Sequence, residues 1–221
     1  MSPSPGALRR FLVVESLLMT LPSLPAWNLT SLVFFIDTHI LDATDDESAL
    51  LRKLYEMNWI SLRRTDAMDT ELAAAPEEKW AALTEASAAY AESLGPMVLD
   101  HSRLDHSVLG SDEDVARDDL VFSTLFPGAD RATCRKNHIR DAMHVATAIR
   151  YGGRAFVTKE RKLLNKSDRI AELFQGFRIW SPAQALAEAA SAVAHARELY
   201  RREPARGSLP EWPSDGDLRS A

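Results

Sequence analysis

The chain has 221 residues and a formal net charge of −6, from 26 Lys and Arg against 32 Asp and Glu. This length suits one α/β domain with appendages or two small domains, and a hydrophobic share of 46% is ordinary for a globular protein. The acidic balance argues against a general nucleic-acid coat protein, because phosphate binding depends largely on Lys and Arg. A single cysteine, Cys134, excludes an internal disulfide framework and a thiolate zinc cluster, and it favours a reducing, cytoplasmic compartment.

Residues 1–30 are predicted to form an N-terminal extension. Arg9 and Arg10 precede an apolar run and resemble the start of a weak signal peptide, but Glu15 interrupts the run and no small-x-small cleavage site follows. The run is also too short to span a bilayer. We therefore expect no membrane association.

The organised part of the chain begins with an uninterrupted apolar run, Val33 to Ile36, that ends at Asp37. Such a run, rich in β-forming residues, is typical of a strand covered on both faces. By similar reasoning we expect strands at 31–37, 59–62, 97–100, 155–158 and 177–180.

Segments with capping residues, alanine and helical apolar spacing separate these strands. We expect helices at 42–55, 65–93 with a break at Pro76, 111–126, 137–151, 159–174 and 181–200. Strands that alternate with helices predict βαβ units and a parallel β-sheet flanked by helices. The expected organisation is an α/β domain over 31–185, a C-terminal helix over 186–202, and a disordered tail over 203–221, which is rich in Pro, Gly, Ser and Asp.

Four acidic residues stand near the ends of strands or the starts of helices. Asp37 ends the first strand, and Glu71 lies about two helical turns beyond the second. Asp141 opens a helix, and Glu160 lies two residues after Thr158 at the end of a strand. Because sites in open parallel sheets form outside the carboxyl ends of the strands, we expect these acids to meet at one edge.

The ordered set of these motifs resembles the PIN-domain nuclease family. The set consists of the first strand ending in Asp37-Thr38, then Glu71-Leu72, then the D-A-x-x-x-A-T-A-x-x-x-G pattern from Asp141 to Gly152, then Phe156-Val-Thr158-Lys-Glu160. The resemblance covers about residues 31–185 and is strongest over 137–164. It implies a PIN-like parallel sheet and a nuclease active site.

The resemblance also implies roles for individual residues. Asp37, Glu71, Asp141 and Glu160 would be the catalytic metal ligands, with the hydroxyls of Thr38 and Thr158 in support. Glu160 departs from the commoner aspartate, so the extra methylene places its carboxylate differently or changes the metal preference.

Alternatives to these roles remain open at this stage. Asp66 and Asp69 compete with Glu71 for the second position. Asp37 also suits a helix cap, and Asp141 also suits a helix N-terminus, where an acid stabilises the dipole. Glu71 fits an exposed helix surface and Glu160 a first helical turn. His144 is predicted to be a packed or surface histidine, with assistance to catalysis or to the fold as the alternative.

The residue types fit metal chemistry, since hard cations such as Mg²⁺ and Mn²⁺ prefer carboxylate oxygens. A metal in such a site orients a scissile phosphate and activates water. Arg140 and Lys159 adjoin the acids and are the preferred phosphate-binding candidates. Further cations are Arg63, Arg64, Arg131, Arg135, Lys136, Arg161 and Lys162.

The sequence therefore predicts a Mg²⁺- or Mn²⁺-dependent endoribonuclease that hydrolyses RNA phosphodiester bonds. The resemblance extends to VapC-type toxins of type II toxin–antitoxin pairs, which implies an antitoxin protein as a partner besides RNA. The alanine-rich final helix, Ala185 to Arg202, suits packing against the domain or against a second subunit, so a homodimer stays open. The alternative is a catalytically weak PIN-like module that binds RNA or a protein partner; the unusual Glu160 and the acidic surface motivate it.

Overall fold

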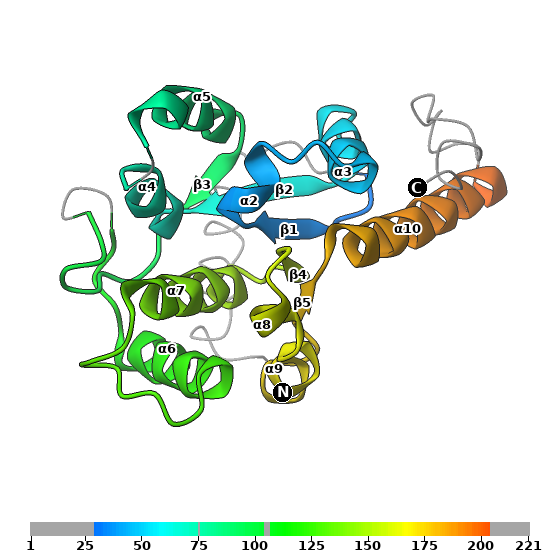
Figure 1. Ribbon diagram of the computed structural model, residues 1–221. Helices are drawn as coiled ribbons and strands as arrows, with labels where there is room; N and C mark the ends of the chain where they lie inside the picture. Colours follow the sequence, from blue (N-terminus) through cyan, green and yellow to red (C-terminus); the bar gives the residue numbers. More distant parts are fainter. Residues whose placement is uncertain (1–28, 75, 104–106, 204–221) are drawn as a thin grey trace, which may run out of the picture.

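The computed structural model describes residues 29–74, 76–103 and 107–203 (Figure 1). Apart from Leu29 and Thr30, the expected N-terminal extension lies outside the described residues. The same holds for the expected tail after Glu203.

Five strands form one all-parallel sheet in the order β3-β2-β1-β4-β5. The strands are β1 (Val33–Ile36), β2 (Ser61–Thr65), β3 (Ala91–Ser93), β4 (Ala155–Val157) and β5 (Arg178–Trp180). The prediction of an α/β fold with a parallel sheet is thus confirmed. β1 is the central strand, and the strand order reverses between β1 and β4, the kind of position where ligands bind in open parallel sheets.

Helices cover both faces of this sheet (Figure 1). They are α2 (Thr38–Leu41), α3 (Asp46–Glu56), α4 (Ala67–Leu72), α5 (Glu77–Ala88), α6 (Asp112–Leu125), α7 (Lys136–Arg150), α8 (Arg161–Leu164), α9 (Ser167–Leu173) and α10 (Pro182–Arg202). Within the described ranges, no helix has both the length and the apolar composition needed to cross a membrane.

The alternation of side chains along β1 divides the core into two layers. Phe34 and Ile36 point into a cluster that α3 and α10 cover, whereas Phe35 points into a cluster that α6 and α7 cover. β4 repeats the pattern, with Ala155 and Val157 on the first side and Phe156 on the second. Both central strands are therefore buried on both faces, as their continuous apolar sequence predicts.

The edge of the sheet differs from the sequence prediction. The expected helix over 65–93 ends at Ala88, and Ala91–Ser93 forms β3 instead. The expected strand over 97–100 is wrong, since these residues form no strand; an isolated bridge joins Pro96, just before them, to Val108. β3 carries no apolar β-forming run, so pairing with β2 rather than intrinsic preference makes it a strand.

Two helical segments also differ in extent. The expected helix over 159–174 is divided into α8 and α9, because the chain turns at Asn165 and Lys166. α10 is continuous across the boundary expected at 185/186. It begins with a Ser181–Gln184 capping box and packs its buried face into the core beside α3.

A tight contact joins the end of the sheet to α4 and α7. The buried carboxylate of Asp66 accepts hydrogen bonds from the backbone N–H groups of Ala67, at 3.1 Å, and of Gly95, at 2.9 Å. A Cβ atom on Gly95 would lie 2.5 Å from Oγ1 of Thr147 and 3.0 Å from Oδ1 of Asp66. Glycine is therefore required here for close approach.

We expect Gly95→Ala to lower the free energy of unfolding by about 1–3 kcal/mol, the usual cost of overpacking. Thr147→Ala removes the nearest colliding atom, so the double variant should recover part of this loss. Urea unfolding of the two single variants and the double variant measures the coupling. Strictly additive losses would contradict the contact.

Candidate active site

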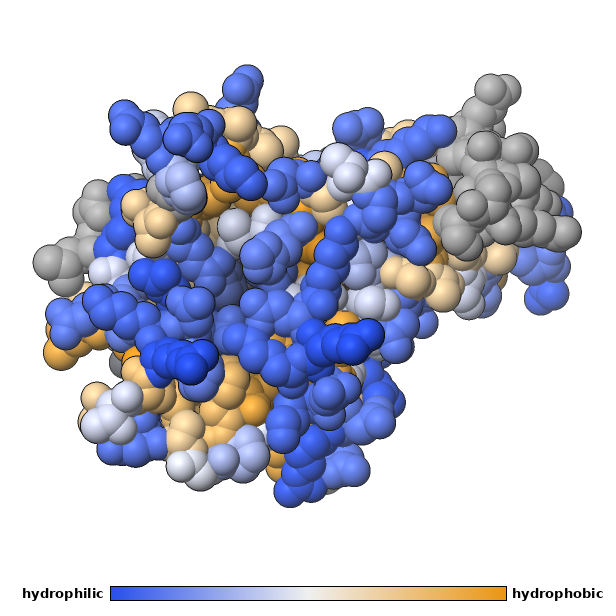
Figure 2. Space-filling model, viewed as in Figure 1, coloured by the Kyte–Doolittle hydropathy of each residue, from blue (hydrophilic) through white to orange (hydrophobic). Residues whose placement is uncertain are grey.

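The four acids singled out in the sequence line one cavity of about 410 Å³. The cavity lies where β1 and β4 end, and α2, α4, α5 and α7 contribute to its walls. The surface in this region is mostly hydrophilic (Figure 2). Its lining consists of Asp37, Thr38, His39, Asp42, Glu71, Ala74, Pro76, Lys79, Leu83, Asn137, Arg140, Asp141 and Glu160. The structure therefore brings together acids that are far apart in the sequence.

Asp37 follows β1 directly and starts α2. Its backbone N–H donates to the carbonyl of Val157 at 2.9 Å, which continues the pairing of β1 with β4. Its Oδ2 accepts a hydrogen bond from the hydroxyl of Thr158 at 2.5 Å. Burial raises the pKa of Asp37, although the nearby imidazole of His144 opposes the shift. The side chain is thus fixed in place but costly to ionise without a positive partner.

Glu71 reaches the cavity from α4, and its Oε2 accepts a hydrogen bond from the hydroxyl of Thr38. The two alternatives for this position lie elsewhere. Asp66 binds backbone N–H groups, and Asp69 forms ion pairs with Arg64 and Arg103. Of these three neighbouring acids, only Glu71 lines the cavity.

His144 lies beneath the acids and is 1% exposed. Its Nδ1 is 2.5 Å from the hydroxyl of Thr65, and its Nε2 is 3.4 Å from Oε2 of Glu71. Burial disfavours the charged imidazole, but Glu71, Asp37 and Asp141 outweigh it and raise the pKa of His144 to about 8. At neutral pH a positive charge therefore lies under the cluster.

The pairing of His144 with Glu71 also affects the carboxyl. Burial raises the pKa of Glu71, but the charge of His144 and its contact, together with the hydroxyl of Thr38, lower it below its ordinary value. The sequence analysis favours a packed or surface role for His144 and does not predict its contact with Glu71. The available signal was its position three residues after Asp141, which places both side chains on one side of α7.

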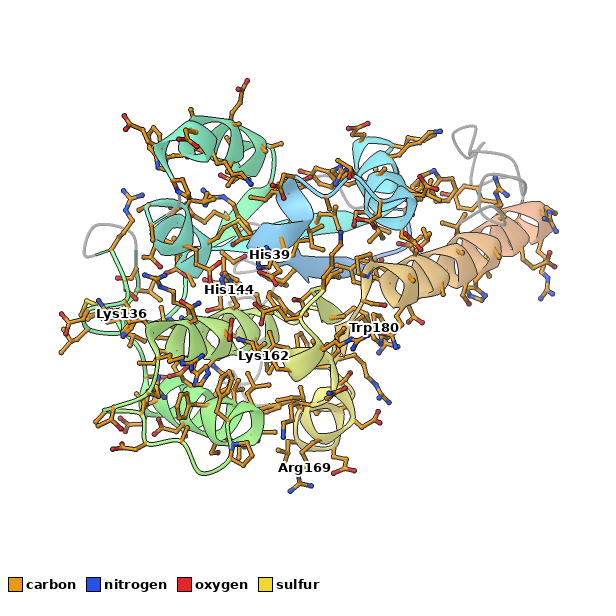
Figure 3. The ribbon with its side chains drawn as sticks, viewed as in Figure 1. His39, Lys136, His144, Lys162, Arg169 and Trp180 are labelled. Carbon is orange, nitrogen blue, oxygen red and sulfur yellow. The ribbon has the colours of Figure 1, made fainter. Side chains whose placement is uncertain are left out.

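Asp141 and Glu160 share one cation. Nζ of Lys162 lies 2.8 Å from Oδ2 of Asp141 and 2.9 Å from Oε2 of Glu160, and the backbone N–H of Glu160 donates to Oγ1 of Thr158. His39 is 3.8 Å from the other oxygen of Glu160. Figure 3 shows His39, His144 and Lys162 gathered around this part of the molecule. Burial raises the pKa of Asp141 to about 6, although Lys162 opposes the shift.

The two phosphate-binding candidates from the sequence have different environments. Arg140 lines the cavity, and its charge acts on Glu71. Lys159 forms an ion pair with Asp45 and does not line the cavity. Two other predicted cations are neutralised locally, since Arg64 pairs with Asp69 and Glu92 and Arg131 pairs with Asp118 and Asp119.

The donor chemistry of this cavity fits Mg²⁺ or Mn²⁺. All four acids offer carboxylate oxygens, and burial makes Asp37 and Asp141 harder to ionise in the absence of added positive charge. Among the residues that the structure describes, no three acidic, histidine or cysteine side chains converge as a ready-made ligand group. Threonine hydroxyls and Lys162 instead hold the carboxylate oxygens.

A larger cavity of about 800 Å³ is lined by other residues of α7. Its walls include Met97, His101, Val115, Ile139 and Met143. None of the four acids of the first cavity lines it. Asp100, Asp114, Asp118 and Asp119 line the larger cavity, but arginines pair with the last three of them. The smaller cavity is the candidate active site because it holds the four acids that follow strand ends or begin helices in the sequence motifs.

Comparison of the chain with protein-family models, with curated proteins and with solved structures gave no match.

The imidazole of His144 should make stability depend on pH. Its pKa in the folded protein is raised from 6.5 to about 8. The charged imidazole therefore contributes fully to the free energy of unfolding below pH 6.5, and this contribution is lost as the pH rises through 8. In EDTA, we expect the wild type to lose about 2 kcal/mol more than His144→Gln between pH 6 and pH 9. Urea unfolding across this range measures the difference, and parallel stability curves would contradict a charged His144.

Proposed function

We propose that the protein is a metal-dependent ribonuclease that hydrolyses RNA phosphodiester bonds at the acidic cavity. The observation that carries this proposal is the meeting of Asp37, Glu71, Asp141 and Glu160 in one cavity where the strand order reverses. The parallel sheet is compatible with the PIN-like fold that the sequence motifs imply. All four acids that the motifs single out line the cavity, together with Asp42.

The neighbours of each acid give it a defined position. Thr158 fixes Asp37, Thr38 and His144 fix Glu71, and the carboxylates of both face the same cavity. Such partners orient metal ligands and adjust their basicity. The chemistry that Mg²⁺ or Mn²⁺ supplies in a carboxylate site of this kind is orientation of the scissile phosphate, stabilisation of its developing charge and activation of water.

Arg140 provides a binding partner for the anionic substrate. Its guanidinium belongs to the cavity wall beside Glu71, and a guanidinium can bind a phosphate through two parallel hydrogen bonds. Lys79 of α5 adds a second cation to the wall. These two cations offset the repulsion that the acids exert on an RNA backbone.

A toxin of a type II toxin–antitoxin pair is the biological role that the VapC-type resemblance supports. An antitoxin protein and a second copy of the chain are then the expected protein partners. Expression of the chain alone should arrest growth if this role is right, and co-expression of an antitoxin should relieve the arrest.

A catalytically weak module that binds RNA or protein is the second candidate. One observation favours it: Lys162 engages Asp141 and Glu160 together, and Glu160 is the residue that departs from the family pattern. A labelled RNA incubated with Mg²⁺, Mn²⁺ or EDTA separates the candidates. Metal-dependent cleavage supports the nuclease, whereas intact RNA under all three conditions supports the module.

We expect Asp37→Asn and Asp141→Asn each to reduce RNA cleavage by more than about 100-fold, since even partners outside the ligand sphere typically contribute about 10- to 100-fold. Asp46→Asn is the matched control, because Asp46 is an exposed acid at the start of α3. The measurement is the single-turnover rate with saturating Mn²⁺. Full cleavage by either variant would exclude that residue from the active site.

Arg140→Ala should weaken RNA binding and reduce the slope of log affinity against log salt by about 0.7, the value for one phosphate contact on a single strand. Lys159→Ala should have a smaller effect because Lys159 is paired with Asp45. Both are measured in the Asp37→Asn background, so that the RNA stays intact. An unchanged slope for Arg140→Ala would remove Arg140 from the RNA contact.

A further inference from the structure

Lys162 has a different relation to the acids from that of the other groups around them. Asp37 and Glu71 accept hydrogen bonds from threonine hydroxyls, and Oε2 of Glu71 also lies 3.4 Å from Nε2 of the buried His144. By contrast, the ammonium of Lys162 lies between Oδ2 of Asp141 and Oε2 of Glu160, at 2.8 and 2.9 Å. One full positive charge therefore joins two of the four acids.

This position is one that a divalent cation would need. Carboxylates that bind Mg²⁺ or Mn²⁺ direct their oxygens at the ion at about 2.0–2.1 Å, as Mg²⁺ requires. An ammonium already bonded to the same two carboxylates and a divalent cation close to them would repel each other strongly. The ammonium of Lys162 and a divalent cation therefore cannot both bind Asp141 and Glu160 in the arrangement seen here.

The side chain of Lys162 is also able to move away from the two acids. Its side chain is 45% exposed, and it projects from α8, a helix of only four residues. Apart from the two acids, its ammonium contacts the ring of Phe126, at 5.8 Å from the centroid. A flexible four-carbon stem with a strongly hydrated end group can move into water at little cost.

We propose that Lys162 is an internal counter-ion that competes with the divalent cation for Asp141 and Glu160. In the metal-free protein it neutralises these acids and stabilises the fold. When the metal binds, Lys162 is displaced, so the metal concentration at which the site fills is set by this lysine. The inference rests on the metal site of the proposed function. It adds that Lys162 raises the metal concentration needed to fill that site.

Lys159 provides a matched control for this role. It lies three residues before Lys162, its side chain is 41% exposed, and it forms an ion pair with Asp45, which is not among the four acids. Lys162→Met and Lys159→Met remove the same charge from the same surface and keep a similar apolar stem. Only Lys162→Met removes the ammonium that is paired with Asp141 and Glu160.

The experiment is calorimetric titration of the metal-free proteins with Mn²⁺ alone, with melting temperatures measured in EDTA and in Mn²⁺. We expect Lys162→Met to bind Mn²⁺ about tenfold more tightly than the wild type, a modest effect for a charge at this distance. In EDTA it should melt about 2–4 °C lower, and Mn²⁺ should raise its melting temperature more than that of the wild type. Lys159→Met should bind Mn²⁺ like the wild type.

The outcomes separate this inference from the proposed function. Equal or weaker Mn²⁺ affinity in Lys162→Met overturns the inference even if the wild type cleaves RNA. Tighter binding supports it even if no RNA is cleaved, and in that case the ribonuclease proposal fails alone. An absence of Mn²⁺ binding in both proteins overturns it, because removal of the ammonium would then reveal no cation site. If Lys162→Met does not fold, Lys162→Gln replaces it with the same expected direction.

Discussion

Four carboxylates around one small cavity repel one another, so the surrounding structure has to supply positive charge and hydrogen-bond donors. The donors come from different parts of the chain: Thr158 for Asp37, Thr38 and His144 for Glu71, and Lys162 for Asp141 and Glu160. His144 is fully enclosed, whereas Lys162 reaches the acids from the surface. The cluster therefore has one buried cation below it, the imidazolium of His144, and one partly exposed cation beside it, the ammonium of Lys162.

The order of the strands makes this arrangement possible. β1 and β4 are adjacent although they are far apart in the sequence, and both end at the same edge of the sheet. Asp37 directly follows the first and Thr158 the second, so a side-chain hydrogen bond between them adds to the backbone hydrogen bond from Asp37 to Val157. α4 and α7, which pack against each other, bring Glu71 and Asp141 to the cavity at this edge.

Sequence patterns predicted the parts of the fold that depend on local hydrophobicity and capping. The buried strands β1 and β4, the capped helices α6 and α10, and the positions of the acids relative to them follow from apolar runs and helix signals. β3 was missed because its residues, Ala91–Ser93, are strand only through pairing with β2. The contacts of His144 and Lys162 were missed because they depend on distances between segments, and no local pattern distinguishes a lysine that reaches an acid from one that is solvated.

The hydrogen bond between Thr158 and Asp37 also has a consequence for how the protein folds. The two residues are 121 positions apart in the sequence, and the pairing of β1 with β4 joins the same distant segments. Contacts between residues so far apart in the sequence form slowly, because loop closure costs entropy before the other contacts of the sheet can offset it. During synthesis, Asp37 leaves the ribosome long before Thr158 exists. The acids therefore remain dispersed on the growing chain, and a newly made molecule has no assembled cavity until nearly all of the domain is complete.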